Sequence, residues 1–190
     1  MTYEELIPKI LDGSESAFME LFDMYKDKVY ATALVILRDP CAAEDILQET
    51  FLIIYKKIYS LKNIESFEGW LHKITINCCN SHLRKRKKHL LIDQNIFEAT
   101  VNDISSDQPE KMYFEKQCNS ELTKAIGKLT YKLRTCIVLY YFNEFTIKQI
   151  SEILDCSEGT VKSRLFKGKR ALERHLNLKN PKEVSIYGNR

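Results

Sequence analysis

The 190-residue chain carries 29 Lys and Arg against 26 Asp and Glu, a formal net charge of +3. This near balance excludes binding to nucleic acid through a global excess of cations, so the distribution of charge along the chain matters more. The six cysteines lack paired C-x-x-C spacing, and no apolar run is long enough to span a membrane. We therefore expect reduced thiols, no metal or cofactor, and a cytoplasmic protein.

Helical periodicity dominates the sequence. Only six Gly and four Pro residues occur, and apolar residues recur at intervals of three and four, which predicts an all-α fold. A first helix is expected to begin at Ser14 or Ser16. It must end near Arg38, because the residue before Pro40 is disfavoured in the helical conformation.

A second helix is expected to start at Asp39 and Pro40, a capping acid followed by proline at the first helical position. Its outer face combines one leucine with two carboxylates and an amide: Leu52, Asp45, Glu49 and Gln48. An exposed leucine in such surroundings is typical of a protein-binding surface. A metal site at the two acids is the weaker interpretation, because no histidine or third acid lies at a supporting position.

A third helix, with Ser66 as its expected cap, runs to about Lys88. One of its faces interleaves two amides with three cations: Lys73, Asn77, Asn80, Arg84 and Lys87. Amides and cations together suit contacts with phosphates and unstacked bases. Trp70 lies beside this face, where a core anchor is a more usual role for tryptophan than a stacking platform.

Residues 146–176 predict two helices joined by a short turn. Thr146 and Gln149 form a capping box for the first helix, and Ser157 can cap the second. The second helix divides into an apolar side and a side with hydroxyls and cations, which is typical of a recognition helix in the DNA major groove. Gly168 lies on the apolar side, where the missing side chain would let a neighbouring helix approach closely.

The helical period lapses over residues 89–111, which are polar and rich in acids and therefore predict a linker. The chain is thus expected to form two small helical domains, residues 1–88 and 112–178, joined by this acidic linker. The C-terminal domain would be a helix-turn-helix domain, followed by a tail over residues 179–190.

Three motifs carry a resemblance to a known family: DPCAAEDILQETF (39–51), WLHKITINCCNSHLR (70–84) and EGTVKSRLFKGKRAL (158–172). With these motifs in this order, the chain resembles bacterial RNA polymerase sigma factors of the extracytoplasmic-function (ECF) group over residues 16–176. The resemblance implies a protein that binds core RNA polymerase, directs it to specific promoters and assists promoter melting. It also implies an anti-sigma factor as a partner, which could hold a chain without its own span at the membrane.

The resemblance also assigns a role to each polar face. Docking on core RNA polymerase would fall to Asp45, Gln48, Glu49 and Leu52. Contacts with the melted non-template strand of the minus-ten element would fall to Lys73, Asn77, Asn80, Ser81 and Arg84, with Lys87 on the same face. Contacts with duplex promoter DNA at the minus-thirty-five element would fall to Glu158, Thr160, Lys162, Ser163, Arg164 and Lys167.

Two positions depart from the family pattern. The family usually has an acid where Ser81 stands and a proline where Thr130 stands. The first departure leaves the base preference at the minus-ten element open. The second is expected to matter little, because threonine can also start a helix.

Two other function classes are weighed as alternatives. A stand-alone helix-turn-helix regulator would need an effector pocket or a receiver domain, and the N-terminal half predicts neither strands nor a glycine-rich phosphate loop. An enzyme would be a nuclease that uses Asp45 and Glu49 or a thiol enzyme that uses Cys78 or Cys79. No base lies at a persuasive spacing from these groups, so the sequence favours a protein that is not an enzyme.

Overall fold

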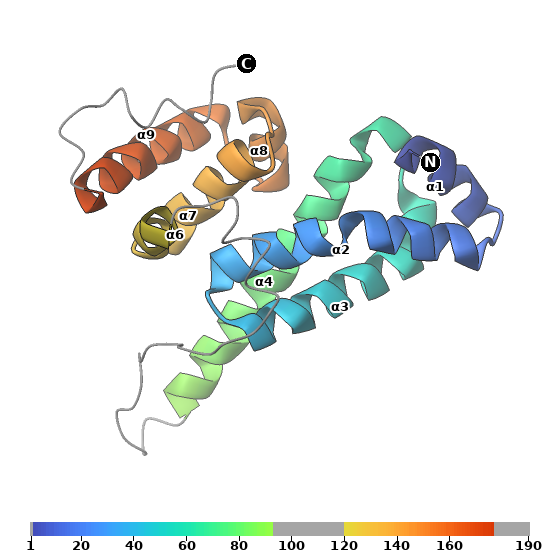
Figure 1. Cartoon of the computed structure of the whole chain (residues 1–190), viewed down its shortest axis with the longest axis horizontal. Coiled ribbons are helices and arrows are strands. Elements are labelled where there is room, and N and C mark those ends of the chain that lie inside the picture. The colour runs from blue at the N-terminus through green and yellow to red at the C-terminus, as the bar shows by residue number, and fades with distance from the viewer. Residues whose placement is uncertain (1, 93–119, 177–190) are drawn as a thin grey trace.

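The computed structural model describes residues 2–92 and 120–176, and within these ranges the chain is helical and contains no strand. Figure 1 shows two groups of helices: α1 to α4, coloured blue to green, and α6 to α9, coloured yellow to red. The two groups meet where α2 and α4 contact the C-terminal helices. The predicted all-α fold is therefore confirmed for this part of the chain.

The N-terminal group consists of α1 (Tyr3–Leu11), α2 (Glu15–Leu37), α3 (Pro40–Lys57), α4 (Phe67–Ile92) and two short 3₁₀ turns, Ile58–Ser60 and Ile64–Ser66. The C-terminal group consists of α6 (Ser120–Gly127), α7 (Tyr131–Ile137), a π-helical turn at Val138–Phe142, α8 (Ile147–Ile153) and α9 (Glu158–His175). The predicted linker falls mostly on residues 93–119, and the predicted tail on residues 179–190; both stretches lie outside the described residues.

Local capping chemistry sets the helix boundaries of the N-terminal group. The Ser14 side chain accepts a hydrogen bond from the backbone N–H of Ala17, and Asp39 does the same for Ala42. Arg38 ends α2 in the left-handed conformation, with φ 61°. The predicted start and end of α2 and the predicted start of α3 are confirmed.

Two features of this group differ from the sequence-based expectation. Helix α1 was not expected, although Thr2 and Glu5 form a capping box before it. Ser66 does not cap α4 as predicted. It ends a 3₁₀ turn that Asn63 caps, and its hydroxyl donates to the Asn63 carbonyl oxygen over 2.7 Å.

An aromatic cluster holds α1 to the rest of the N-terminal group. Phe67 is fully buried, and its ring stacks on Tyr3 with the centroids 5.7 Å apart. The edge of Tyr25 meets the same ring at 5.5 Å. Because one residue from each of α1, α2 and α4 takes part, the cluster fixes where α4 begins relative to its neighbours.

The helix-turn-helix forms as the sequence predicts. Thr146 and Gln149 make both hydrogen bonds of the capping box, and Ser157 caps α9 by accepting from the Thr160 backbone N–H. At Gly168, an added Cβ would stand 2.9 Å from Cγ1 of Ile137 on α7. The predicted close helix approach is confirmed, and α7 is the helix that approaches α9.

Among the helices that the structure describes, none is both long enough and apolar enough to cross a lipid bilayer.

Candidate polymerase and nucleic-acid interfaces

The outer face of α3 carries the residues predicted to bind a protein. Ala43, Ile46 and Ile54 are buried on its inner face, which turns Asp45 and Gln48 outward. Leu52 is 59% exposed, and Glu49 is half-buried beside it. The four predicted residues therefore lie on one accessible surface.

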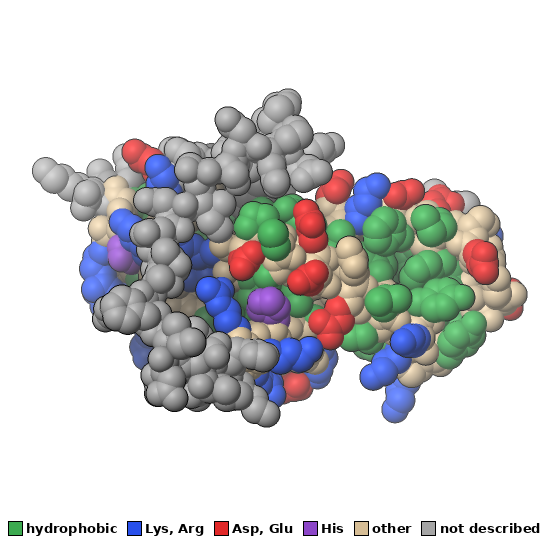
Figure 2. Space-filling model, turned by 90° about the horizontal axis from the view of Figure 1, so that it is seen from below, with side chains coloured by type: hydrophobic (Ala, Val, Ile, Leu, Met, Phe, Trp, Pro, Cys, Tyr) green, Lys and Arg blue, Asp and Glu red, His purple; other side chains and the backbone are tan. Residues whose placement is uncertain are grey.

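This face is longer and more apolar than the sequence analysis anticipated. Tyr55 and Tyr59 continue it at helical spacing, and Tyr59 is 67% exposed. Figure 2 shows hydrophobic side chains gathered over the right half of the molecule, with several carboxylates to their left and a few Lys and Arg side chains at their edges. The spacing 52, 55, 59 could have revealed the two tyrosines, because exposed aromatic side chains are enriched in protein interfaces.

On α4, the predicted minus-ten residues fall into two groups. Asn77 and Arg84 are exposed, and Ser81 is half-buried. Lys73 and Asn80 instead contact the C-terminal domain: Lys73 Nζ lies 2.7 Å from an Asp155 carboxylate oxygen, and the Tyr131 hydroxyl donates to Asn80 Oδ1 over 2.9 Å. The side chain of Lys87 lies outside the described residues.

On α9, four of the predicted minus-thirty-five residues line one hollow, namely Thr160, Ser163, Arg164 and Lys167, while Glu158 and Lys162 are not part of its lining. Glu158, Lys162, Ser163 and Lys167 are exposed, and Thr160 is half-buried. The Arg164 guanidinium lies along the turn, with Nη1 3.8 Å from Cys156 Sγ. Side chains that can reach base edges thus stand beside cations that can contact phosphates.

A hollow of about 650 Å³ opens between the start of α7 and the first two turns of α9. Lys132 from α7 shares its lining with Arg164 and Lys167. The sequence analysis did not identify Lys132, because it lies outside the recognition helix. Three cations around one concave surface suit a stretch of phosphate backbone.

Phe166, on the exposed side of α9, is a second residue that the sequence analysis did not single out. It is 62% exposed on α9, and the Arg170 guanidinium lies over its ring at 5.3 Å. An exposed aromatic ring on a recognition helix can contact the methyl group of thymine. The sequence could have revealed Phe166, because this residue lies between Ser163 and Arg170 on the polar side of the helix.

The cysteines on α4 do not fit a thiol enzyme. Burial raises the pKa of the Cys78 thiol to about 11 and that of Cys79 to about 12, which disfavours the nucleophilic thiolate. Within residues 2–92 and 120–176, no group of three or more His, Cys, Asp and Glu side chains is placed to hold a metal ion.

The sequence matches two family models, one in each half of the chain. The family model for Sigma-70 region 2 matches residues 21–89, and that for Sigma-70 region 4 matches residues 119–172. The ECF RNA polymerase sigma factor SigW of Bacillus subtilis (strain 168) is 32% identical over 182 residues, covering 93% of this chain and 97% of that protein. The chain belongs to the ECF RNA polymerase sigma factors.

Other members of the family are similar over comparable lengths. The RNA polymerase sigma-H factor of Pseudomonas aeruginosa is 26% identical over 181 residues, covering 91% of this chain and 93% of that protein. The sigma factor RpoE from Bartonella quintana, solved in complex with the anti-sigma factor NepR, aligns with a TM-score of 0.69 and 22% identity. That alignment covers 86% of this chain and 98% of the other chain, and it supports the fold.

A second solved structure, CnrH in complex with the cytosolic domain of CnrY, aligns with a TM-score of 0.64 and 16% identity over 92% of this chain and 97% of that one. In this ECF sigma factor, region 2 therefore contains the faces of α3 and α4, and region 4 contains the helix-turn-helix. Helix α1 precedes both matched regions.

Proposed function

We propose that this ECF sigma factor binds core RNA polymerase through α3, holds the melted minus-ten strand on α4 and reads the minus-thirty-five duplex with α9. The observation that carries the proposal is one chain with an apolar and acidic face on α3 and two separate basic faces, one in each domain. A factor of this kind assists initiation without a catalytic step of its own.

The chemistry of α3 suits a protein partner. Exposed Leu52 and Tyr59 offer apolar area, while Asp45 and Glu49 add charge that would select a basic partner surface. We assign this face to the polymerase. The contacting residues of this face would be Asp45, Gln48, Glu49 and Leu52, with Tyr55 and Tyr59 extending it.

The chemistry of α4 and α9 suits two forms of DNA. Exposed Asn77 and Arg84 can bind bases and phosphates of a single strand. Exposed Ser163 and Lys167 lie in the first ten residues of an 18-residue helix, which fits a major groove. The remaining residues assigned to the minus-ten element are Lys73, Asn80, Ser81 and Lys87. The remaining residues assigned to the minus-thirty-five element are Glu158, Thr160, Lys162 and Arg164.

Because such a factor binds polymerase and promoter DNA, we expect it to act in the cytoplasm, where both are found. We also infer an anti-sigma factor as a regulatory partner, because the aligned RpoE was solved with one. A stand-alone helix-turn-helix regulator is not favoured, because the region 2 match leaves no segment for an effector domain in the N-terminal half.

Run-off transcription with core polymerase and genomic fragments, including the region upstream of its own gene, tests the proposal. We expect discrete transcripts that depend on the added protein. Reversing both charges (Asp45→Lys with Glu49→Lys) should weaken copurification with core polymerase at least about tenfold, because like charges would then face each other. The matched control is Asp23→Lys with Asp27→Lys, which reverses two exposed acids at the same spacing on α2. Equal losses in the two double variants would contradict the assignment to α3.

A further inference from the structure

The outermost line of α9 carries an apolar ring. Four exposed residues recur at helical spacing along this line, which we call the outward stripe: Gly159, Ser163, Phe166 and Arg170. Val161, Gly168 and Leu172 are buried on the opposite side of the same helix. The outward stripe is therefore the part of α9 that would enter a major groove most deeply.

The two flanks of α9 differ in charge. On one flank, Arg164 and Lys167 line the hollow together with Lys132 of α7. The other flank carries two cations and two acids: Lys162, Lys169, Glu158 and Glu173. Because cations gather at the hollow, we expect a phosphate backbone there. The outward stripe would then face the base edges of the groove.

The ring of Phe166 is suited to one chemical group on those base edges. It is 62% exposed, so contact with an apolar group would remove apolar area from water. Base edges in the major groove offer hydrogen-bond donors and acceptors, and the C5 methyl group of thymine is their apolar group. A methyl group on the same carbon distinguishes 5-methylcytosine from cytosine. A phenyl ring on the outward stripe therefore favours a C5-methylated pyrimidine.

Arg170 adds a second requirement. Its guanidinium carbon lies over the Phe166 ring, 5.3 Å from the ring centroid. Arginine in the major groove most often reads guanine, by donating to O6 and N7. Successive base pairs are stacked about 3.4 Å apart. A guanidinium held beside the ring would therefore meet a base pair that neighbours the methylated one.

We propose that Phe166 and Arg170 together read a C5-methylated pyrimidine next to a guanine within the minus-thirty-five element. The inference rests on the proposed function and adds a base specificity to it. Thymine and 5-methylcytosine carry the same methyl group at the same place, so both satisfy the ring. Methylation of a cytosine at this position would then strengthen promoter binding.

Competition binding of the holoenzyme to a promoter found by run-off transcription tests the proposal, with one base of the minus-thirty-five element changed at a time. Deoxyuridine in place of thymine removes the methyl group alone. We expect this change at the position that the ring contacts to weaken binding about fourfold, as the burial of one methyl group predicts. At the same position, 5-methylcytosine should bind about fourfold more tightly than cytosine.

Phe166→Ala should abolish both differences, so that each methylated base and its unmethylated counterpart bind equally. Phe166→Leu should retain most of each difference, because an apolar side chain remains. The matched control is Tyr140→Ala, which removes another exposed aromatic ring of the C-terminal domain and should keep both fourfold ratios. Arg170→Ala should remove the penalty for 7-deazaguanine, which lacks the N7 acceptor, at the neighbouring base pair.

Equal binding of thymine and deoxyuridine duplexes by the wild-type holoenzyme, at each thymine of the element, would overturn the proposal. A methyl preference that persists in Phe166→Ala would overturn it as well. Either result, obtained with a holoenzyme that initiates at the promoter, refutes the methyl reading alone. A wild-type holoenzyme that yields no transcript refutes the proposed function itself.

Discussion

The two helices that we assign to DNA, α4 and α9, carry similar side chains, but they differ in how many of these side chains already have partners within the protein. On α9, Ser163 and Lys167 are exposed, and a basic hollow opens beside them. On α4, Lys73 and Asn80 are already hydrogen-bonded to the C-terminal domain. Local sequence placed cations and polar side chains on both helices, but tertiary packing decides which of them is free to bind DNA. The face of α9 that we assign to duplex DNA is accessible, whereas the face of α4 that we assign to the melted strand is partly covered.

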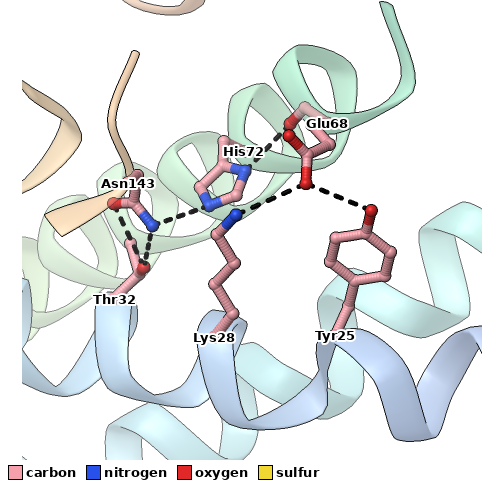
Figure 3. Close-up of polar contacts among 6 residues, drawn as sticks. All are labelled: Tyr25, Lys28, Thr32, Glu68, His72 and Asn143. Atoms are coloured by element: carbon pink, nitrogen blue, oxygen red, sulfur yellow. Dashed lines mark hydrogen bonds and ion pairs between the residues drawn. The ribbon is translucent and has the colours of Figure 1, made fainter. Parts of the chain in front are cut away.

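The largest expected effect concerns the buried cluster of Thr32, His72 and Asn143, in which the Asn143 amide donates to Thr32 Oγ1 and to His72 Nε2 (Figure 3). The pKa of His72 is lowered to about 4, chiefly by burial and also by nearby Lys28, while the Glu68 carbonyl and carboxylate oppose the shift. The unfolded chain gains a proton on this imidazole near pH 6.5, whereas the folded chain stays neutral until about pH 4. Stability is therefore fully present above pH 6.5 and decreases between pH 6.5 and 4, by roughly 3 kcal/mol in total.

Urea denaturation at several pH values measures this loss. The variant His72→Gln should remove this component of the pH dependence, while His175→Gln, at the exposed end of α9, should retain it. Identical pH profiles for His72→Gln and the wild type would contradict the burial of a neutral imidazole at position 72.

A smaller effect is expected in the C-terminal domain, where α9 packs on α7. Gly168→Ala would place a methyl group 2.9 Å from Cγ1 of Ile137, and overpacking of this kind costs about 2 kcal/mol. Gly159→Ala on the same helix is the control, because its Cβ would meet nothing closer than 3.9 Å. Thermal unfolding should separate the two variants, and equal midpoints would show that α7 does not restrict the position of α9.

The smallest change is expected in the salt dependence of promoter binding. Arg164→Ala with Lys167→Ala removes two cations from the hollow, so the log–log slope of affinity against salt should flatten by about 2. The control, Lys124→Ala with Lys128→Ala, removes two exposed cations at or just beyond the end of α6. Footprinting of the minus-thirty-five element by the holoenzyme at several salt concentrations measures the slope. A flattening as large in the control variant would mean that the hollow does not contact phosphates.

The sequence was most informative where partners lie three or four residues apart. The caps at Ser14, Asp39, Thr146 and Ser157 and the apolar stripes between them depend on local spacing, so boundaries and faces could be predicted. Helix α1 was missed despite its capping box, because Pro8 interrupts the pattern that Leu6 and Ile10 would otherwise display.

Contacts between distant residues could not be predicted in this way. Lys73 pairs with a residue 82 positions later, and Asn80 with one 51 positions later. Nothing in the local pattern of α4 distinguishes these two side chains from Asn77 or Arg84, which remain exposed. The sequence analysis did not single out Arg134, although this residue ties α7 to the end of α2 through a hydrogen bond to the Ile36 carbonyl oxygen. The availability of the minus-ten face is therefore a property of the tertiary fold.

Zero-length cross-linking with a water-soluble carbodiimide tests the contact between α4 and the C-terminal domain most directly, because it joins only amines and carboxylates already in contact. In the free protein, mass spectrometry should find an amide between Lys73 and Asp155 as well as one between Lys26 and Asp23, since both pairs lie 2.7 Å apart. With core polymerase bound, the Lys73–Asp155 product should disappear while the Lys26–Asp23 product persists. A Lys73–Asp155 product that is absent from the free protein, or equally abundant in the holoenzyme, would contradict the account.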